Sequence, residues 1–211
     1  MKITKLVLGA CNTNCYIVAS KQKNCIIIDP ADDGERIVSE VVKQGLTVKY
    51  IFVTHGHTDH VLALEYVKDY FGAPVVISRI DAWRLEDEEL INERPYVEIP
   101  YKAVKPDILI EENSVIEVDE LKFRFYGMPG HTDGSMAIVL EDIIFTGDTL
   151  LKENHGKTTL PGGNEAKLIE SINRLAREFS GDYKILTGHR EETTLAYERL
   201  HNPYINLVQN N

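Results

Sequence analysis

The segment from Thr54 to His60 restricts what this chain can fold into more than any other part of the sequence. It reads THGHTDH and lies between the apolar run 49–53 and residues 60–71, whose apolar positions have helical spacing. In extended backbone, His55 and His57 point the same way. Burying several imidazoles and a carboxylate in one turn is costly without partners, and both groups are ligands for zinc, iron or manganese. We therefore predict a metal-binding turn between a strand and a helix, in preference to a solvated polar turn.

Further candidate ligands follow three other predicted strands. Each is a histidine or aspartate preceded by a glycine, which lets the backbone turn sharply at the strand end. One such pair alone is equally typical of an ordinary turn. A metal ion needs three or four protein ligands, however, and the repetition predicts a site built from several strand ends. The pairs are Gly130-His131 after residues 121–126, Gly147-Asp148 after 142–146 and Gly188-His189 after 183–187.

The remaining pattern predicts helices packed outside sheets. Strands come first, then a β-α-β unit, more strands and an α-β-α unit, an order that suits helical layers on packed sheets. Residues 91–113 have no strong period and contain Pro95, Pro100 and Pro106, so we predict a long surface loop of the kind that often forms a lid. The predicted strands are 3–8, 15–19, 25–29, 49–53, 74–77, 114–118, 121–126, 136–140, 142–146 and 183–187, and the predicted helices are 34–44, 60–71, 79–90, 164–179 and 192–200.

Composition excludes several classes of partner. The 211 residues suit a single domain spanning 1–211. No run approaches the roughly 20 apolar residues of a membrane span, and the N-terminal segment alternates like a strand, so we expect a cytoplasmic location and no membrane partner. A net charge of −10 without a Lys/Arg run argues against nucleic acid. The odd set of Cys11, Cys15 and Cys25 argues against a disulfide framework, and oligomeric state leaves no readable signal.

Three motifs together resemble the metallo-β-lactamase superfamily, closest to its glyoxalase II-like (hydroxyacylglutathione hydrolase-like) branch. They are His-x-His-x-Asp-His, Pro-Gly-His-Thr-x-Gly-Ser and Thr-Gly-Asp-Thr-Leu, and the resemblance covers nearly the whole chain. It implies an α/β (α+β) fold, a four-layer αβ/βα sandwich with the site at one edge. It also implies two metal positions: His55, His57 and His131 at the first, Asp59, His60 and His189 at the second, and Asp148 bridging both.

The resemblance implies a metal-dependent hydrolase that cleaves a small-molecule thioester or ester. The nucleophile would be a hydroxide shared by two divalent ions, with zinc expected and iron or manganese as alternatives. Asp59 and Asp148 are the expected catalytic residues because they bind metal and orient this nucleophile. Antibiotic-degrading members lack the carboxylate of Asp148, so β-lactamase activity is not expected. His131 and His189 should donate their free ring N–H groups to partners, for which Asp29 and Thr58 are candidates, with a turn cap as the alternative role of Asp29.

Candidate substrate-binding residues come from two segments. Gly156-Lys157 resembles the Gly-Lys or Gly-Arg step that binds the anionic end of a substrate, with a solvated lysine as the alternative. His155 is a second candidate, with a surface-loop histidine as the alternative. Tyr96 and Tyr101 in the predicted loop are further candidates, unless they pack within it. Residues 190–211 leave room for one or two helices, but not for the helical region with which glyoxalase II binds glutathione.

Two other functions fit the same ligands. Persulfide dioxygenases share the fold and most of the motif but use a single iron on the first three histidines, so one iron per chain and oxygen consumption would favour this alternative. A non-catalytic metal-binding module is the second alternative, because fold alone does not determine function. Retention of all seven ligands argues against the non-catalytic module, whereas it does not separate the hydrolase from the dioxygenase.

Overall fold

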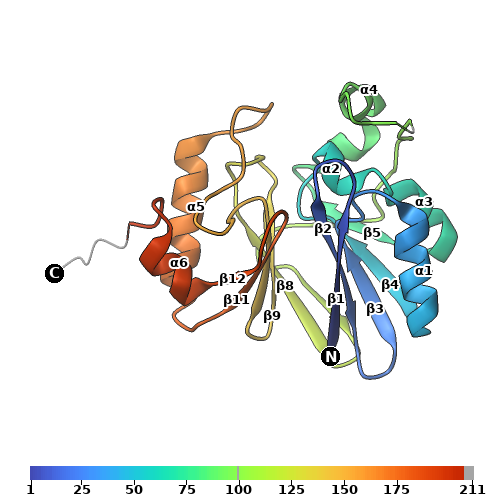
Figure 1. The fold of residues 1–211 in the computed structure, drawn as a ribbon, viewed down its shortest axis with the longest axis horizontal. Helices are drawn as coiled ribbons and strands as arrows, with labels where there is room; N and C mark the ends of the chain where they lie inside the picture. The colour runs from blue at the N-terminus through green and yellow to red at the C-terminus, as the bar shows by residue number, and fades with distance from the viewer. Residues whose placement is uncertain (99, 207–211) are drawn as a thin grey trace.

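The computed structural model describes residues 1–98 and 100–206, which form two six-stranded mixed sheets packed face to face. Helices cover the outer face of each sheet, so the chain builds four layers in the order α, β, β, α (Figure 1). This arrangement confirms the α/β (α+β) class and the four-layer αβ/βα sandwich predicted from the sequence.

The first sheet takes its strands in chain order, from β1 to β6. Its first three strands are antiparallel, whereas β3 to β6 run parallel. The helix α1 ends at Gly45, whose left-handed φ of 64° lets its N–H bond the last carbonyls. The strands are β1 (Lys2–Leu8), β2 (Thr13–Ala19), β3 (Asn24–Ile28), β4 (Thr47–Phe52), β5 (Val75–Ser78) and β6 (Ile108–Ile110), and the helices are α1 (Gly34–Gln44), α2 (Thr58–Val61), α3 (Leu64–Phe71), the 3₁₀ helix η1 (Ala82–Glu86) and α4 (Glu88–Asn92).

The second sheet is an antiparallel meander from β7 to β10, to which β11 adds in parallel beside β10. Its longest helix, α5, has 14 residues, and within the described ranges no helix has the length and apolar character needed to cross a membrane. The elements are β7 (Val115–Val118), β8 (Leu121–Gly127), β9 (Met136–Leu140), β10 (Ile143–Gly147), α5 (Glu165–Glu178), β11 (Lys184–Thr187), β12 (Thr193–Thr194) and α6 (Leu195–His201).

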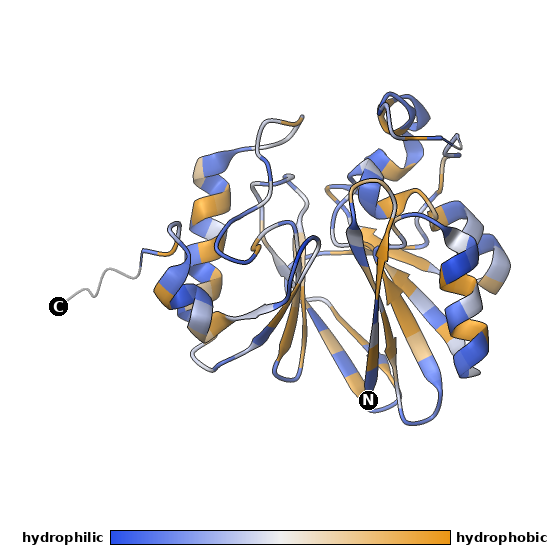
Figure 2. Ribbon diagram, in the orientation of Figure 1, coloured by the Kyte–Doolittle hydropathy of each residue, from blue (hydrophilic) through white to orange (hydrophobic). Residues whose placement is uncertain are grey.

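Three apolar layers hold the sandwich together. In the middle layer, Phe52 of β4 packs edge-on against Phe123 and Phe125 of β8, with ring centroids 5.2 Å apart in both pairs. Such pairs contribute about 0.5–1.5 kcal/mol beyond the buried area. The outer layers join the first sheet to α1 and α3, and the second sheet to α5 and α6. Figure 2 shows the hydrophobic residues concentrated along the strands and alternating with hydrophilic ones on the helices.

The prediction of one continuous helix over residues 60–71 is wrong. The chain forms α2 and α3 instead, because the N–H of Ala63 between them donates to the carbonyl of Pro30 (3.0 Å) rather than within one helix. The short α2 thus lies next to the end of β3. The helix predicted over 79–90 is likewise divided, into η1 and α4.

Two short strands were not predicted. Residues 91–113, predicted to be a loop, contain the last residues of α4 and all of β6, which pairs in parallel with β5. Residues 192–200, predicted to be one helix, begin with β12 and continue as α6. Both strands are at sheet edges, and tertiary pairing rather than a local pattern determines such short strands.

Candidate metal centre

All seven predicted ligands lie together at one edge of the sandwich. Four come from the turn after β4 and from α2, which follows it directly, and the other three follow β8, β10 and β11. They form three overlapping groups. Within each group, the candidate ligand atoms all lie within 4.8 Å of one another. The groups are His55, His57 and His131; His55, His60 and Asp148; and Asp59, His60 and His189.

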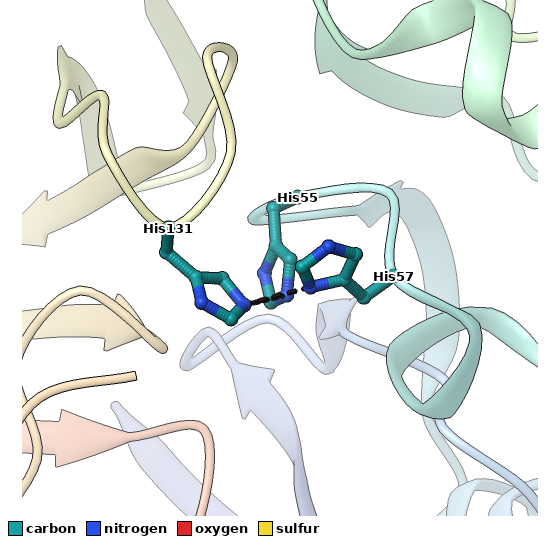
Figure 3. A group of neighbouring side chains, drawn as sticks. All are labelled: His55, His57 and His131. Carbon is teal, nitrogen blue, oxygen red and sulfur yellow. Dashed lines mark hydrogen bonds between the residues drawn. The ribbon is translucent and has the colours of Figure 1, made fainter. Parts of the chain in front are cut away.

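The first group consists of three buried imidazoles that point toward one another (Figure 3). His131 Nε2 lies 2.7 Å from His57 Nδ1 and 3.0 Å from His55 Nε2. His55 and His57 come from the first half of the chain and His131 from the second. This group of three imidazoles therefore forms only when the two sheets pack together.

Asp148 lies between this group and the second one. Its Oδ2 is 3.6 Å from His131 Nε2 in the first group and 3.4 Å from His189 Nε2 in the second. Its Oδ1 is 3.4 Å from His60 Nε2. The second group is closed by His189 Nε2, which lies 3.1 Å from Asp59 Oδ2. Asp148 therefore occupies the position from which one carboxylate can contact ions at both groups.

Hydrogen bonds on the far side of three rings determine which nitrogen carries the proton. His131 Nδ1 donates to the carbonyl of Lys157 (2.7 Å), and His189 Nδ1 donates to the carbonyl of Cys11 (3.2 Å). His60 Nδ1 donates to the carboxylate of Asp29 (2.9 Å). Because these partners only accept, each neutral ring keeps a lone pair on the nitrogen that faces the centre.

A fourth ring, His55, is held in the same tautomer by two hydrogen bonds in series. The hydroxyl of Thr54 donates its hydrogen to Asp29 (2.7 Å), so it accepts from His55 Nδ1 (3.1 Å). His55 Nε2 is thus left with a lone pair facing the centre. His57 differs, because its buried outer Nε2 has no hydrogen-bond partner among the described residues.

Asp29 has a larger role than the sequence indicated. It binds the outer nitrogen of His60 as well as the hydroxyl and the N–H of Thr54, the latter at 2.7 Å. The partners of His131 and His189 are backbone carbonyls instead, and Thr58 serves none of the four rings. Carbonyl partners leave no sequence signal, so residue types could not identify them.

The electrostatics of the centre favour a bound cation. Burial and the neighbouring imidazoles lower the pKa of His55 well below its usual range and that of His57 to about 3. Burial opposes ionisation of Asp148, but His60 and the other imidazoles lower its pKa to about 2. Burial likewise opposes a charge on His60, yet the carboxylates of Asp148 and Asp59 raise its pKa. Converging lone pairs beside two carboxylates fit divalent metal, for which nitrogen and carboxylate oxygen are ligands.

A cavity of about 870 Å³ opens over the centre. Of the predicted substrate residues, Lys157, His155 and Tyr96 line it. Sequence reasoning missed Arg94, Cys11 and Arg190 as lining residues. Burial and the Asp59 carboxylate raise the pKa of Cys11, so its thiol is protonated at neutral pH.

Arg190 has one signal in the sequence, namely its place directly after the predicted ligand His189. It adopts a left-handed backbone with φ of 65°, a conformation uncommon for residues other than glycine. Such residues often cluster at functional sites. An arginine in this conformation on the cavity wall is therefore a candidate functional residue.

The structure contradicts the predicted substrate role of Tyr101. Its side chain is 3% exposed and packs in the core between the first sheet and its helices. Its hydroxyl donates to the carbonyl of Leu85 at 2.9 Å, and its N–H donates to Asn92 at 2.8 Å. Tyr101 is therefore a packing residue, whereas Tyr96 in the same segment reaches the cavity.

A four-layer sandwich with imidazoles and carboxylates gathered at one edge defines a class of metal-binding proteins. Residues 8–189 match the model of the Metallo-beta-lactamase superfamily, and the chain belongs to that family. It is accordingly a metal-dependent hydrolase of the superfamily, with histidine and aspartate clusters suited to divalent metal.

Named relatives support the glyoxalase II-like branch. The chain is 30% identical over 210 residues to "Hydroxyacylglutathione hydrolase GloC" of Haemophilus influenzae, covering 98% of this chain and 99% of that protein. Among solved structures it is similar to BLEG-1, described as a B3 metallo-beta-lactamase (30% identity, TM-score 0.89, 97% and 100% covered). It is also similar to TTHA1623 in a di-iron-bound form, with 27% identity, a TM-score of 0.85, and coverage of 96% of this chain and 100% of that one. For ETHE1 from Myxococcus xanthus the identity is 27% and the TM-score 0.79, with 96% of this chain and 84% of that one covered.

Proposed function

We propose that the protein hydrolyses a small anionic thioester or ester with two divalent metal ions. The observation that carries the proposal is the convergence of His55, His60, His131 and His189 on Asp148, with the outer nitrogen of each ring bonded to an acceptor so that the inner nitrogen can bind metal. When bound there, divalent ions supply Lewis acidity and lower the pKa of water toward about 7. Zinc is the metal we propose, and the di-iron form of TTHA1623 makes iron the first alternative to test.

The residues of the chain have separate parts in this proposal. His55, His57 and His131 would hold one ion, and Asp59, His60 and His189 the other, with Asp148 in contact with both. Asp59 and Asp148 line the cavity, so their carboxylates also orient the reacting water. The cavity of about 870 Å³ beside these ligands suits a small-molecule substrate.

The charges around the cavity favour an anionic substrate. Lys157, Arg94 and Arg190 line it, and among the described residues none of these side chains forms an ion pair. A carboxylate on the substrate would supply the missing partner, most directly for the planar guanidinium groups, which bind carboxylates in a bidentate manner. GloC is described as acting on hydroxyacylglutathione, whose glutathione part carries carboxylates, and a related thioester is the substrate class we propose here. His155 is a further proposed contact.

Metal content and thioester hydrolysis, measured on the same preparation, test the proposal. Protein purified without added metal is analysed by mass spectrometry and assayed with a glutathione thioester, with a neutral thioester of similar size as the control. About two metals per chain and preference for the glutathione thioester would support it. One iron per chain with oxygen consumption and no thioester turnover would replace it with persulfide dioxygenase chemistry. Faster turnover of a β-lactam, included because of the likeness to BLEG-1, would contradict the substrate class.

The compartment is a separate proposal. We propose that the protein acts in the cytoplasm, where thiol compounds such as glutathione are kept reduced. The three cysteines Cys11, Cys15 and Cys25 are unpaired in the structure, in keeping with a reducing compartment. Cell fractionation with an antibody against the protein tests this, and recovery outside the cytoplasmic fraction would contradict it.

A further inference from the structure

Two buried charged residues outside the ligand set lie next to the metal centre. Asp81 immediately precedes η1, and Arg84 lies within it; the two are 1% and 3% exposed. Arg84 Nε lies 3.4 Å from Asp81 Oδ1. Neither residue lines the cavity. Burying a charge pair is costly unless further hydrogen bonds satisfy both groups.

The carboxylate of Asp81 joins the two loops that carry the first group of histidines. Its Oδ2 accepts from the N–H of Gly56 (3.0 Å), the residue between His55 and His57. The same oxygen accepts from the hydroxyl of Thr132 (2.7 Å), next to His131. Its Oδ1 accepts from the N–H of Gly134 (3.1 Å) in the same second loop. One side chain therefore connects a loop of the first sheet to a loop of the second.

Glycine is required where these contacts are closest. A Cβ atom added at Gly134 would lie 2.6 Å from Asp81 Oδ1, and one added at Gly56 would lie 2.6 Å from the Cβ atom of Arg84. At these two glycines, the backbone of each loop lies so close to the charge pair that no side chain fits. A glycine in each of the two histidine loops therefore leaves room for Asp81 and Arg84.

Arg84 extends the connection to a third loop. Its Nη2 donates to the carbonyl of Pro161 at 2.7 Å. Pro161 follows residues 156–160, which line the cavity. The carbonyl of Lys157 in that segment accepts from His131 Nδ1. The pair therefore contacts both histidine loops and the loop that supplies the outer partner of His131.

We propose that Asp81, supported by Arg84, is a positioning residue that sets the spacing between His55, His57 and His131 and thereby the affinity of the first metal position. It touches no metal and no substrate. A carboxylate is needed because it only accepts, whereas an amide would point an N–H₂ group at one of the three donors. This inference rests on the proposed metal centre, but it is independent of the proposed substrate.

Metal binding by the stripped protein tests the proposal without any substrate. Zinc is titrated into chelator-treated wild type and Asp81→Asn, in competition with a coloured chelator that reports both dissociation constants. We expect one of the two sites to weaken by about 10–100-fold, the usual cost of losing a partner that orients ligands. The matched control is Asp87→Asn, the same change at the cap of α4, where asparagine caps equally well and both constants should stay at the wild-type values.

The outcomes separate the roles. Wild-type affinity at both sites in Asp81→Asn would overturn the proposal. Lower thermal stability of the metal-free variant with both sites weakened alike would assign Asp81 to general folding and would also overturn it. If wild type binds no zinc, iron or manganese, the proposed metal centre is wrong and this inference falls with it.

A second variant covers the case in which Asp81→Asn does not fold. Thr132→Val removes one of the three bonds to Asp81 and keeps the side-chain volume nearly constant. We expect a smaller loss of zinc affinity at the same single site. If Asp81→Asn does fold, adding Thr132→Val to it should lower the zinc affinity little further, because the two residues act through one contact. Wild-type zinc affinity in Thr132→Val, or full additivity of the two changes, would count against the connection.

Discussion

The two halves of the molecule supply metal ligands in different ways. The first half, built on β1 to β6, places four ligands within residues 55–60 after β4, whereas the second half, built on β7 to β12, supplies one ligand after each of three strands. Their supports differ as well. Asp29 and Asp81 hold the turn of the first half through side chains, but the outer nitrogens of His131 and His189 bond to backbone carbonyls. Changing Asp29 should therefore weaken the first half alone, whereas changing Asp81 should affect one loop of each half. Because a side-chain substitution does not remove a backbone carbonyl, the second half is tested mainly at its ligands.

Asp148→Ala should have the largest effect, because this ligand of the second half faces both metal positions. We expect second-metal occupancy to fall and thioester hydrolysis to drop by more than about tenfold, since even the loss of a supporting partner costs about 10–100-fold. Metal analysis and steady-state kinetics on one preparation measure both. The control is Asp142→Ala, an exposed aspartate in the turn before the same strand. Two retained metals and full activity in Asp148→Ala would remove it from the bridging role.

Asp29→Asn tests whether the first half depends on its side-chain support. The amide would direct an N–H₂ group at His60 Nδ1 or at Thr54, both of which donate to the carboxylate. We expect metal affinity to fall by about 10–100-fold, with the second position affected most because His60 belongs to it. Asp33→Asn, an exposed cap of α1, is the matched control. Equal metal affinity in both variants would show that the turn needs no such support.

The same difference explains what could be predicted from the sequence. Ligands of the first half are adjacent in the chain, so residue types at short spacing revealed them, and the glycines before His131, Asp148 and His189 indicated the rest. Asp81 was missed because its partners are 25 to 53 residues away, and an aspartate in an acidic stretch looks like a surface residue. Pairing of β6 with β5 is equally nonlocal. Local pattern predicts ligands and long elements, whereas supports and edge strands depend on which segments meet.

Lys157→Ala extends the comparison to the cavity wall of the second half. We expect KM for an anionic thioester to rise severalfold with kcat nearly unchanged, because a single exposed charge contributes about 1 kcal/mol to binding. The control is Lys152→Ala in the same segment, whose side chain pairs with Glu191 and does not line the cavity. The neutral thioester should show no difference between variant and wild type. An unchanged KM for the anionic substrate would make Lys157 an ordinary solvated lysine.

The smallest effect is expected for Tyr101→Phe in the first half, which tests whether Tyr101 belongs to the core rather than to the cavity wall. The change removes one hydrogen bond to the carbonyl of Leu85, which still accepts from the N–H of Val104 at 2.8 Å. The free energy of unfolding should therefore fall by only about 1 kcal/mol, a decrease of about 2–4 °C in Tm. Urea denaturation and KM are measured together, with Tyr96→Phe as the comparison from the cavity lining. A raised KM with unchanged stability in Tyr101→Phe would reverse the assignment, because a packing tyrosine affects unfolding and a substrate-contacting one affects binding.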